Sequence, residues 1–423
     1  MPGSDTIFAL SSGLPPAGIA VIRISGPRAG AALTALGGPL PKPRRATARR
    51  LHDAQGAPLD DALVLWLPGP ASATGEDVAE LHLHGGRAVV AAVLSEMALI
   101  PGCRPARAGE FTRRAFENGR IDLAEAEGLA DLLAAETDVQ RQSALVLAEG
   151  GLGRLVATWE RQLLAESARI EALLDFADEG DVAADDPSTA ALEALAAALK
   201  SHLAAPPAER LRDGVRVVLA GPPNSGKSSL FNYLLGREAA IVTPIAGTTR
   251  DRLEAPISLD GVPLLLIDTA GLRAETPDAV EAIGIARSGE AMAAADILLW
   301  LGPAEDAPPG ALLIATKVDL DKGSRAGIPL SVVTGEGVAL LREAIVTAAR
   351  ALLPRPGALA LNARHRGVIA EVAAALDEAL ATADLLIRAE ALRLARQRLD
   401  ALTGRSGVES MLDALFGAFC IGK

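Results

Sequence analysis

The feature that most constrains this chain is a glycine-rich loop between an apolar segment and a helical one. The loop reads Gly-x-x-x-x-Gly-Lys-Ser from Gly221 to Ser228 and follows the apolar residues 215–220. Its two glycines allow a tight turn, so that successive backbone N–H groups point at phosphate oxygens. Lys227 is expected to reach the β- and γ-phosphates, and the Ser228 hydroxyl to bind Mg²⁺. The segment therefore predicts a nucleotide site.

This loop lies within a longer alternating segment, residues 213–353. Short apolar runs that read as strands alternate here with helical stretches, and the runs are VRVVLAG, PLLLIDTAG, DILLWLG and ALLIATKVD. Such alternation is typical of a doubly wound sheet of parallel strands with helices on both faces. We therefore predict an α/β nucleotide-binding domain over residues 213–353.

The segments on both sides of this domain are predicted to be helical. Apolar residues recur at helical spacing before it, at Leu152, Leu155, Trp159, Leu163, Ile170 and Leu174, and after it, at Ile369, Val372, Leu376, Leu380, Ala383 and Ile387. The ends of a compact domain often lie close together, so an insertion is easy to accommodate. We predict one helical domain, residues 119–212 and 354–423, that carries the α/β domain as an insertion.

The first part of the chain, residues 1–118, has a mixed pattern. The runs AGIAVIRIS, DALVLWLPG and DVAELHLHGG read as strands, and RAVVAAVLSEMAL reads as a helix. An α+β domain is therefore predicted before the helical one.

Charge and composition limit the possible partners. A net charge of −12 gives no general attraction to nucleic acid, so any RNA contact would need a local basic patch. We find no secretory signal and no run of about 18 apolar residues, which predicts a cytoplasmic protein without a membrane span. The two cysteines, Cys103 and Cys420, lie in different contexts, which argues against a disulfide scaffold.

Further motifs in the α/β domain indicate which nucleotide it binds. Asp268-Thr269-Ala270-Gly271 ends one apolar run, where the aspartate can hold Mg²⁺ through water and the glycine N–H can contact a γ-phosphate. Thr316-Lys317-Val318-Asp319 ends another and is similar to the guanine-reading Asn-Lys-x-Asp element of GTPases. Asp319 can accept hydrogen bonds from guanine N1–H and N2–H₂, which adenine does not offer.

Departures from the usual GTPase residues, one in that element and others in the next loop, predict a reduced affinity for guanine. Thr316 stands where an asparagine is usual and cannot reproduce an amide's donor and acceptor pair. The next base-contacting loop keeps Ser331 but has Val332 and Val333 in place of the usual Ala and Lys. The elements occur in the order found in GTPases, and we predict GTP hydrolysis.

The residues suggest how the γ-phosphate would be cleaved. Leu272 stands where many GTPases have a water-orienting glutamine, and it offers no hydrogen bond. Oxygen atoms of Asn224, Thr243, Ile245 and Thr248 can instead surround a monovalent cation beside the phosphates, with Thr249 completing the Mg²⁺ shell. Such a cation would supply the positive charge that an arginine supplies elsewhere.

Taken together, the motifs resemble one family. GPPNSGKSSL, GTTRD, DTAGLR, VEAIGIA and the terminal CIGK, together with DTIFAL, IRISGP, GEDVAELHLHGG and RPARAGEFTRRAFENGRIDLAEAEGLADL near the N-terminus, are similar to the MnmE (TrmE) tRNA-modification GTPases. The resemblance covers almost the whole chain. It implies a folate-binding and dimerising N-terminal domain, a helical domain and an inserted GTPase domain.

The same resemblance implies cofactors and partners. A homodimer would bind GTP, Mg²⁺, K⁺ and a 5-formyl or 5,10-methylene tetrahydrofolate. With an FAD-dependent, MnmG-like partner it would place a carboxymethylaminomethyl or aminomethyl group on the wobble uridine of certain tRNAs.

Carried over by position, the resemblance assigns site residues. The magnesium ligands are Ser228 and Thr249, and the potassium ligands are Asn224, Thr243, Ile245 and Thr248. Glu281 is the catalytic acid that orients the attacking water. The folate contacts are Arg23, Glu80, Arg120 and Lys423. The GTP contacts are Asn224, Ser225, Gly226, Lys227, Ser228, Ser229, Thr243, Pro244, Ile245, Ala246, Gly247, Thr248, Thr249, Asp268, Thr269, Ala270, Gly271, Thr316, Lys317, Val318, Asp319, Ser331, Val332 and Val333.

Cys420, four residues from the end, has more than one interpretation. A prenylation signal fits badly, because Gly422 and Lys423 follow it. The family resemblance places the tail beside the folate, where a thiolate near Lys423 would be a second catalytic group. The alternative is that Phe416, Phe419 and Cys420 only anchor the tail.

Two other functions stay open on the residues alone. One is a GTP-dependent switch in RNA assembly without modification chemistry, and the other is a helical scaffold whose conformation GTP sets. Neither would need folate or a flavoprotein partner.

Overall fold

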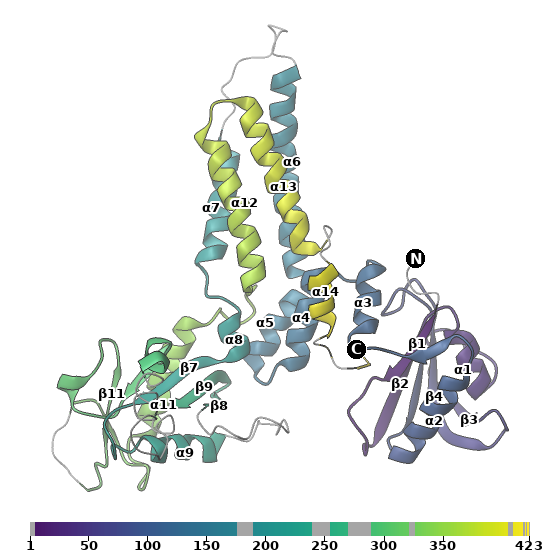
Figure 1. The fold of residues 1–423 in the computed structure, drawn as a ribbon, viewed down its shortest axis with the longest axis horizontal. Coiled ribbons are helices and arrows are strands. Elements are labelled where there is room, and N and C mark those ends of the chain that lie inside the picture. The colour runs from purple at the N-terminus through teal and green to yellow at the C-terminus, as the bar shows by residue number, and fades with distance from the viewer. Residues whose placement is uncertain are drawn as a thin grey trace, which may run out of the picture. The chain divides into compact units, whose positions relative to one another are not determined.

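The computed structural model describes residues 5–175, 189–238, 254–269, 289–320, 326–404, 409–417, 419, 421 and 422. These form two compact units (Figure 1). One comprises Met1–Ala130 with Asp400–Lys423, and the other comprises Asp131–Leu399. The domain boundaries expected at residues 118, 212 and 353 stay predictions.

The first unit contains a six-stranded sheet in the order β3-β4-β5-β2-β1-β6. Its strands are β1 (Thr6–Leu10), β2 (Ile19–Ser25), β3 (Thr47–His52), β4 (Pro58–Leu67), β5 (Val78–His84) and β6 (Cys103–Pro105). Neighbouring strands are antiparallel except β1 and β6, which are parallel. The strands that we predicted near the N-terminus are confirmed as β2, β4 and β5.

Alternation along these strands gives the sheet two different faces. Ile22, Ile24 and Leu81 are fully buried and belong to the core that includes side chains of α1 (Ala29–Gly37) and α2 (Arg87–Leu99). Because successive residues of a strand point to opposite faces, Arg23 and Glu80 lie on the other face. The sheet thus buries one face and keeps charged groups on the other.

Two segments that are distant in the sequence form a smaller core in the same unit. Its helices are α3 (Glu110–Glu117), α4 (Leu123–Ala134) and α14 (Glu409–Gly417). The buried side chains are Leu123, Ala126, Leu412, Phe416 and Phe419. Gly109 begins α3 with a φ of +65°, and a Cβ there would lie 2.1 Å from the carbonyl oxygen of Phe416. Only glycine allows this approach.

The second unit has helices before and after its α/β part, as predicted. They are α5 (Asp138–Ala148), α6 (Gly151–Asp175), α7 (Ala190–Ala204), α8 (Glu209–Asp213), α12 (Ala363–Ala381) and α13 (Leu385–Thr403). Figure 1 shows α7 beside α6 and α12.

The apolar period that we followed from Ile369 to Ile387 is interrupted in the structure. Ile369, Val372 and Leu376 are buried in α12, but Ala383 lies in the turn before α13, and Ile387 is 49% exposed. Arg388 explains the break, because its guanidinium donates to the carbonyl oxygens of Ala379 (3.1 Å) and Thr382 (2.6 Å). The last turn of α12 is capped by this side chain.

The rest of the second unit is the predicted α/β fold. Its sheet has the order β12-β11-β10-β7-β9-β8, and all pairs are parallel except β8 and β9. The strands are β7 (Val215–Ala220), β8 (Glu254–Leu259), β9 (Val262–Asp268), β10 (Ile297–Trp300), β11 (Leu312–Thr316) and β12 (Ile328–Leu330).

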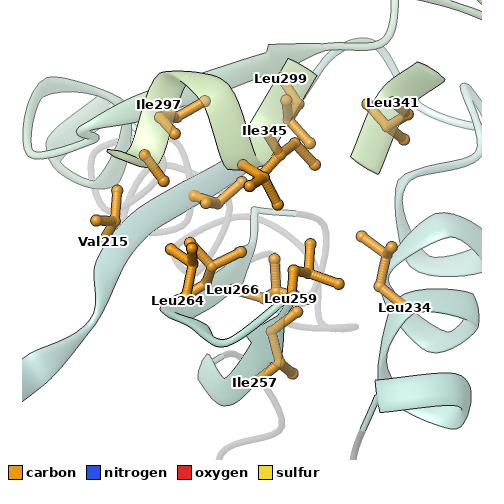
Figure 2. Close-up of a cluster of buried hydrophobic side chains, with 14 of the residues drawn as sticks. Val215, Leu234, Ile257, Leu259, Leu264, Leu266, Ile297, Leu299, Leu341 and Ile345 are labelled. Atoms are coloured by element: carbon orange, nitrogen blue, oxygen red, sulfur yellow. The ribbon is translucent and has the colours of Figure 1, made fainter. Parts of the chain in front are cut away.

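Helices α9 (Lys227–Glu238) and α11 (Val338–Leu352) pack against this sheet. Figure 2 shows how Leu234 of α9 and Leu341 and Ile345 of α11 surround strand residues such as Leu266 and Leu299. Among the described helices, none is long and apolar enough to cross a membrane.

Candidate nucleotide site and candidate folate face

The glycine-rich loop lies at the carboxyl end of β7, where ligands bind in open parallel sheets. The loop runs from Gly221 into α9, which begins at Lys227. It lines a cavity of about 940 Å³, a volume within the range of small-molecule sites. Lysine, hydroxyl and backbone groups line its floor, as a polyphosphate requires.

The backbone of the loop needs its first glycine. Gly221 has a φ of +146°, and a Cβ there would lie 2.5 Å from the carbonyl oxygen of Leu301. Lys227 is 6% exposed, and its Nζ donates to the carbonyl oxygens of Gly221 (2.9 Å) and Pro222 (2.8 Å). The hydroxyl of Ser225 is buried without a hydrogen-bond partner among the described residues. This buried hydroxyl fits a polar ligand in the loop.

Ser228 and Asp268 form the part of the site that suits a divalent cation. Parallel pairing of β7 and β9 sets Leu219 beside Asp268, so the carboxylate lies at the same sheet edge as the loop. Ser228 Oγ donates to Asp268 Oδ2 at 2.9 Å, and Asp268 is 5% exposed. A hydroxyl and a carboxylate this close match the ligands that Mg²⁺ takes in such loops. Thr269 Oγ1 donates a hydrogen bond to the carbonyl oxygen of Leu219 (2.8 Å), which links the end of β9 to β7.

Thr316 and Lys317 join the predicted guanine-reading element to the phosphate loop. Thr316 Oγ1 donates to the carbonyl oxygen of Ser225, and Lys317 Nζ donates to that of Asn224, each at 2.8 Å. Lys317 has a φ of +61°, in the left-handed region, and its side chain extends to the loop. The threonine hydroxyl therefore has a tethering role that sequence reasoning did not foresee. Val318 is half-buried, and Asp319 is exposed.

The three residues of the second predicted base-contacting loop differ in exposure. Ser331 is 1% exposed, and its Oγ accepts a hydrogen bond from the Thr334 N–H at 3.2 Å. This bond stabilises the turn after β12. Val332 packs partly against the core, whereas Val333 is 83% exposed.

Only part of the predicted cation cage and catalytic machinery is described. Asn224 is exposed in the loop with a φ of +59°, in the left-handed region. The other predicted residues of this group lie outside the described part of the chain, namely Thr243, Pro244, Ile245, Ala246, Gly247, Thr248, Thr249, Ala270, Gly271, Leu272 and Glu281.

Outside β7 and the loop, sequence reasoning missed three described residues that line the same cavity. They are Met292, Trp300 and Asp306. Trp300 ends β10, and its indole N–H donates to the carbonyl oxygen of Pro303 (2.8 Å). Its place directly after an apolar run, at the carboxyl end of a central parallel strand, was a usable signal. Met292 and Asp306 carried none.

The predicted folate residues Arg23 and Glu80 are neighbours on the polar face of the first sheet. They are paired across β2 and β5, and both Nε and an Nη atom of Arg23 lie 3.0 Å from Glu80 Oε1. The second oxygen, Oε2, lies 3.3 Å from His82 Nε2. The Arg23 guanidinium is 5.9 Å from the ring centroid of Phe111. His82 and Phe111 thus join the candidate site, although sequence reasoning did not name them.

The other two predicted folate residues are placed less completely. Arg120 is exposed beside Gly75, and no hydrogen bond or ion pair among the described residues joins it to Arg23 or Glu80. Lys423 and Cys420 lie outside the described residues. Their neighbour Gly422 accepts a hydrogen bond from Ser11 Oγ at 2.7 Å, and Ile421 bridges to Ala108. The tail therefore lies against the end of β1, whose Ala9 pairs with Arg23.

An ion network fixes α3 in the same unit. Arg104 bonds Asp5 and Glu110, and the buried Arg114 bonds Asp5 (2.9 Å) and Glu76 (3.1 Å). Burial alone would raise the pKa of Asp5 and of Glu110, but their bonds to arginine outweigh it and hold each pKa below its ordinary value. The same bonds raise the pKa of Arg104. These carboxyl groups are ionised at neutral pH.

Comparison with known proteins places this architecture. The family described as "GTP-binding protein TrmE N-terminus" matches residues 6–120, and the one described as "MnmE helical domain" matches residues 123–420. The chain belongs to the MnmE family. The tRNA modification GTPase MnmE of Novosphingobium aromaticivorans is 58% identical over 99% of this chain and 100% of its own length. That of Rhizorhabdus wittichii is 59% identical over 99% of this chain and 97% of its own length.

One solved structure aligns with part of this MnmE-family chain. The G domain of the FeoB iron transporter of T. maritima is 28% identical and covers 32% of this chain and 98% of that domain, with a TM-score of 0.24. At that TM-score the likeness supports no conclusion about the fold or the function of this chain. The family membership rests on the full-length relatives instead.

Proposed function

We propose that this protein is a potassium-activated GTPase that modifies the wobble uridine of certain tRNAs. Membership of a family whose relatives bear the name tRNA modification GTPase supports the general activity. The bond between Ser228 and Asp268 at the mouth of the phosphate loop is the observation that carries the GTPase half of the proposal. It gathers, at one sheet edge, the groups that a Mg²⁺-bound triphosphate needs.

In this proposal the chain's own residues position GTP for attack by water. Lys227 moves its hydrogen bonds from the loop carbonyls to the β- and γ-phosphates. Ser228 and Thr249 would hold Mg²⁺, with Asp268 beside them, and the ion would neutralise charge on the phosphates. Thr316 and Lys317 keep the loop in register with the base, while Asp319 accepts guanine N–H groups. Glu281 orients the water, because Leu272 offers no hydrogen bond.

Potassium is proposed to bind beside Asn224 of the loop. Asn224, already in a left-handed conformation, would supply Oδ1, and Thr243, Ile245 and Thr248 would supply the remaining oxygens. A cation there lowers the energy of the transition state by countering the negative charge that develops during phosphoryl transfer.

Folate is proposed to bind the polar face of the first sheet. Glu80 can accept hydrogen bonds from pterin N–H groups, with Arg23 orienting its carboxylate, and Arg120 and Lys423 meet the glutamate tail. The fit rests on the Glu80 carboxylate, which is mostly shielded from water and is held by Arg23, whose guanidinium lies over the ring of Phe111. Bound tetrahydrofolate supplies the one-carbon unit. Cys420 would act as nucleophile or proton donor there, or anchor the tail.

The proposed assembly is a cytoplasmic homodimer that works with an FAD-dependent, MnmG-like partner on tRNA. The RNA-assembly switch and the scaffold are the alternatives, and both lack modification chemistry. They predict a protein that hydrolyses GTP but leaves the wobble uridine unchanged.

Potassium dependence provides the direct test of the GTPase mechanism. GTP turnover is measured in KCl and in NaCl at equal ionic strength, for the intact protein and for Asn224→Ala. We expect hydrolysis faster by about 10²-fold in KCl, and we expect Asn224→Ala to lose this difference. Equal rates of the intact protein in both salts would remove the cation from the mechanism.

A further inference from the structure

A part of the first unit has an unusual distribution of charge. The whole protein has a net charge of −12, yet residues 6–52 contain seven Lys and Arg residues and no Asp or Glu. Any contact of this acidic protein with a polyanion needs a local basic surface. The segment that contains these residues leads into β3, the edge strand of the first sheet (Figure 1).

Three of these cations lie in one turn. Lys42, Arg44 and Arg45 are exposed, and with Pro43 they form a β-turn closed by the Arg45 N–H and the Lys42 carbonyl oxygen at 3.3 Å. We call these three residues the basic turn. The Arg44 N–H donates to the carbonyl oxygen of Trp66 at 2.8 Å, which fixes the turn on the end of β4. The charges are therefore presented on a fixed backbone.

Arg44 occupies a conformation that favours glycine. Its φ is +60°, at the third position of a turn whose second residue is proline, where glycine or asparagine is usual. Its guanidinium donates to the carbonyl oxygen of Ala71, which supports the conformation. Non-glycine residues in such conformations cluster at functional sites. An arginine at this position accepts backbone strain that a glycine would avoid, which suggests that its charge has a function.

The basic turn differs from the arginines around α3 in its partners. Arg104, Arg113 and Arg114 of the neighbouring segment all bond carboxylates, and Arg113 lies 2.6 Å from Asp413. Among the described residues, no carboxylate lies within ion-pair distance of Lys42, Arg44 or Arg45. Their charge stays available to a partner.

Edge protection is a competing explanation for cations near β3. Charged side chains on edge strands prevent sheets from pairing with one another. That role needs charge of either sign on the strand itself. The basic turn precedes the strand, so edge protection of β3 does not account for it.

We propose that the basic turn contacts the phosphate backbone of tRNA. This inference rests on the proposed function, because it assigns a surface to the RNA that the protein modifies. Lysine and arginine neutralise phosphates without reading sequence, so the turn would supply affinity and orientation, with strong dependence on salt.

The test measures tRNA affinity of the full-length protein over a range of KCl concentrations. The first variant is Lys42→Gln/Arg45→Gln, which keeps Arg44 and the turn. We expect a loss of roughly 10-fold at low salt and a slope of log K against log salt that is shallower by about 2. Lys42→Gln/Arg44→Gln/Arg45→Gln should lose roughly 30-fold or more.

Two further variants separate the alternatives. Arg393→Gln/Arg398→Gln removes the same charge from exposed positions on α13, where both arginines have carboxylate partners, and should bind tRNA normally. Lys42→Glu/Arg45→Glu keeps charge beside the edge strand but should weaken tRNA binding more than the Gln pair. Wild-type tRNA affinity in this Glu variant would leave edge protection as the role and overturn the proposal.

Other outcomes are equally decisive. Unchanged tRNA affinity in the Gln variants, combined with reduced modification of tRNA in cells, would assign the turn to an acidic protein partner and overturn the proposal. Equal losses in the α13 control would show that only net charge matters. If the intact protein does not bind tRNA at the lowest salt, the basic turn fails as an RNA contact. Nucleoside analysis of a deletion strain then decides separately whether the proposed function stands.

Discussion

The two sheets of this protein present their candidate sites in opposite ways. In the mostly parallel sheet of the second unit, the candidate functional groups lie at or just after the carboxyl ends of strands β7, β9 and β11, at one edge. In the antiparallel sheet of the first unit, Arg23 and Glu80 lie in the middle of strands and meet across the ladder. The first arrangement produces contiguous motifs, and the second produces isolated residues.

The two candidate sites depend on their own backbone to different extents. The phosphate loop offers backbone N–H groups and contains a glycine that no other residue can replace. Much of its binding therefore depends on the backbone conformation. The polar face of the first sheet uses only side chains. Substitutions should therefore separate the two sites cleanly, and each should leave the other intact.

The largest effect is expected at the phosphate loop. Lys227→Ala removes the buried ammonium group and should lower GTP hydrolysis by at least about 10²- to 10³-fold, because that charge acts on the transferred phosphate. Folate binding, measured by calorimetry on the same sample, should be unchanged. Ser201→Ala on the exposed side of α7 is the matched control. A parallel loss of folate binding would show that the two sites are not separate.

A smaller effect is expected on the polar face. Glu80→Gln keeps the shape of the side chain but removes its charge, and folate affinity should fall roughly 10- to 100-fold, the worth of a hydrogen bond to a charged group. Calorimetry with 5-formyltetrahydrofolate measures this, and GTP turnover in KCl serves as the control. Unaltered folate affinity would remove Glu80 from the site.

Thr316 provides a finer test of the nucleotide site. Thr316→Val keeps the volume but deletes the hydrogen bond to Ser225, which should cost about 1 kcal/mol, or roughly 5-fold in GTP affinity. Titration with a fluorescent GTP analogue measures it. An affinity equal to that of the intact protein would show that the threonine does not hold the loop for the nucleotide.

The smallest effect concerns pH and the first unit. The folded protein lowers the pKa of Asp5 and Glu110 below the ordinary values of 3.8 and 4.5. Their ionised forms therefore stabilise the fold above about pH 5, and this stability is lost as the pH falls through the folded-state values. Thermal unfolding should show a lower Tm at pH 4 than at pH 7. Arg104→Gln should lower the Tm at pH 7 and narrow the difference. An unchanged difference would mean that other groups cause it.

Sequence predicted the second unit better than the first for a physical reason. Backbone-built sites need particular residues at fixed spacing, so Gly221, Lys227, Ser228 and Asp268 could be identified one after another. Arg23 and Glu80 were found only through family resemblance, because antiparallel register brings together residues that are 57 positions apart. His82 and Phe111 had no signal at all.

Local chemistry also overrode sequence patterns in two places. The hydroxyl of Thr316 was expected only to weaken guanine recognition, and its bond to the phosphate loop depends on how close β11 lies to that loop. The helical period through Ala383 continued in sequence, yet Arg388 caps α12 and ends it. Hydrogen bonds between distant groups leave no periodic trace.

Both sites are proposed to serve one reaction on tRNA. Mass spectrometry of tRNA nucleosides tests it, with cells that carry the intact protein, Lys227→Ala or Glu80→Gln as their only copy. The account predicts that each variant loses the wobble-uridine modification, although purified Lys227→Ala still binds folate and purified Glu80→Gln still hydrolyses GTP. Full modification of the wobble uridine in cells carrying either variant would contradict the account.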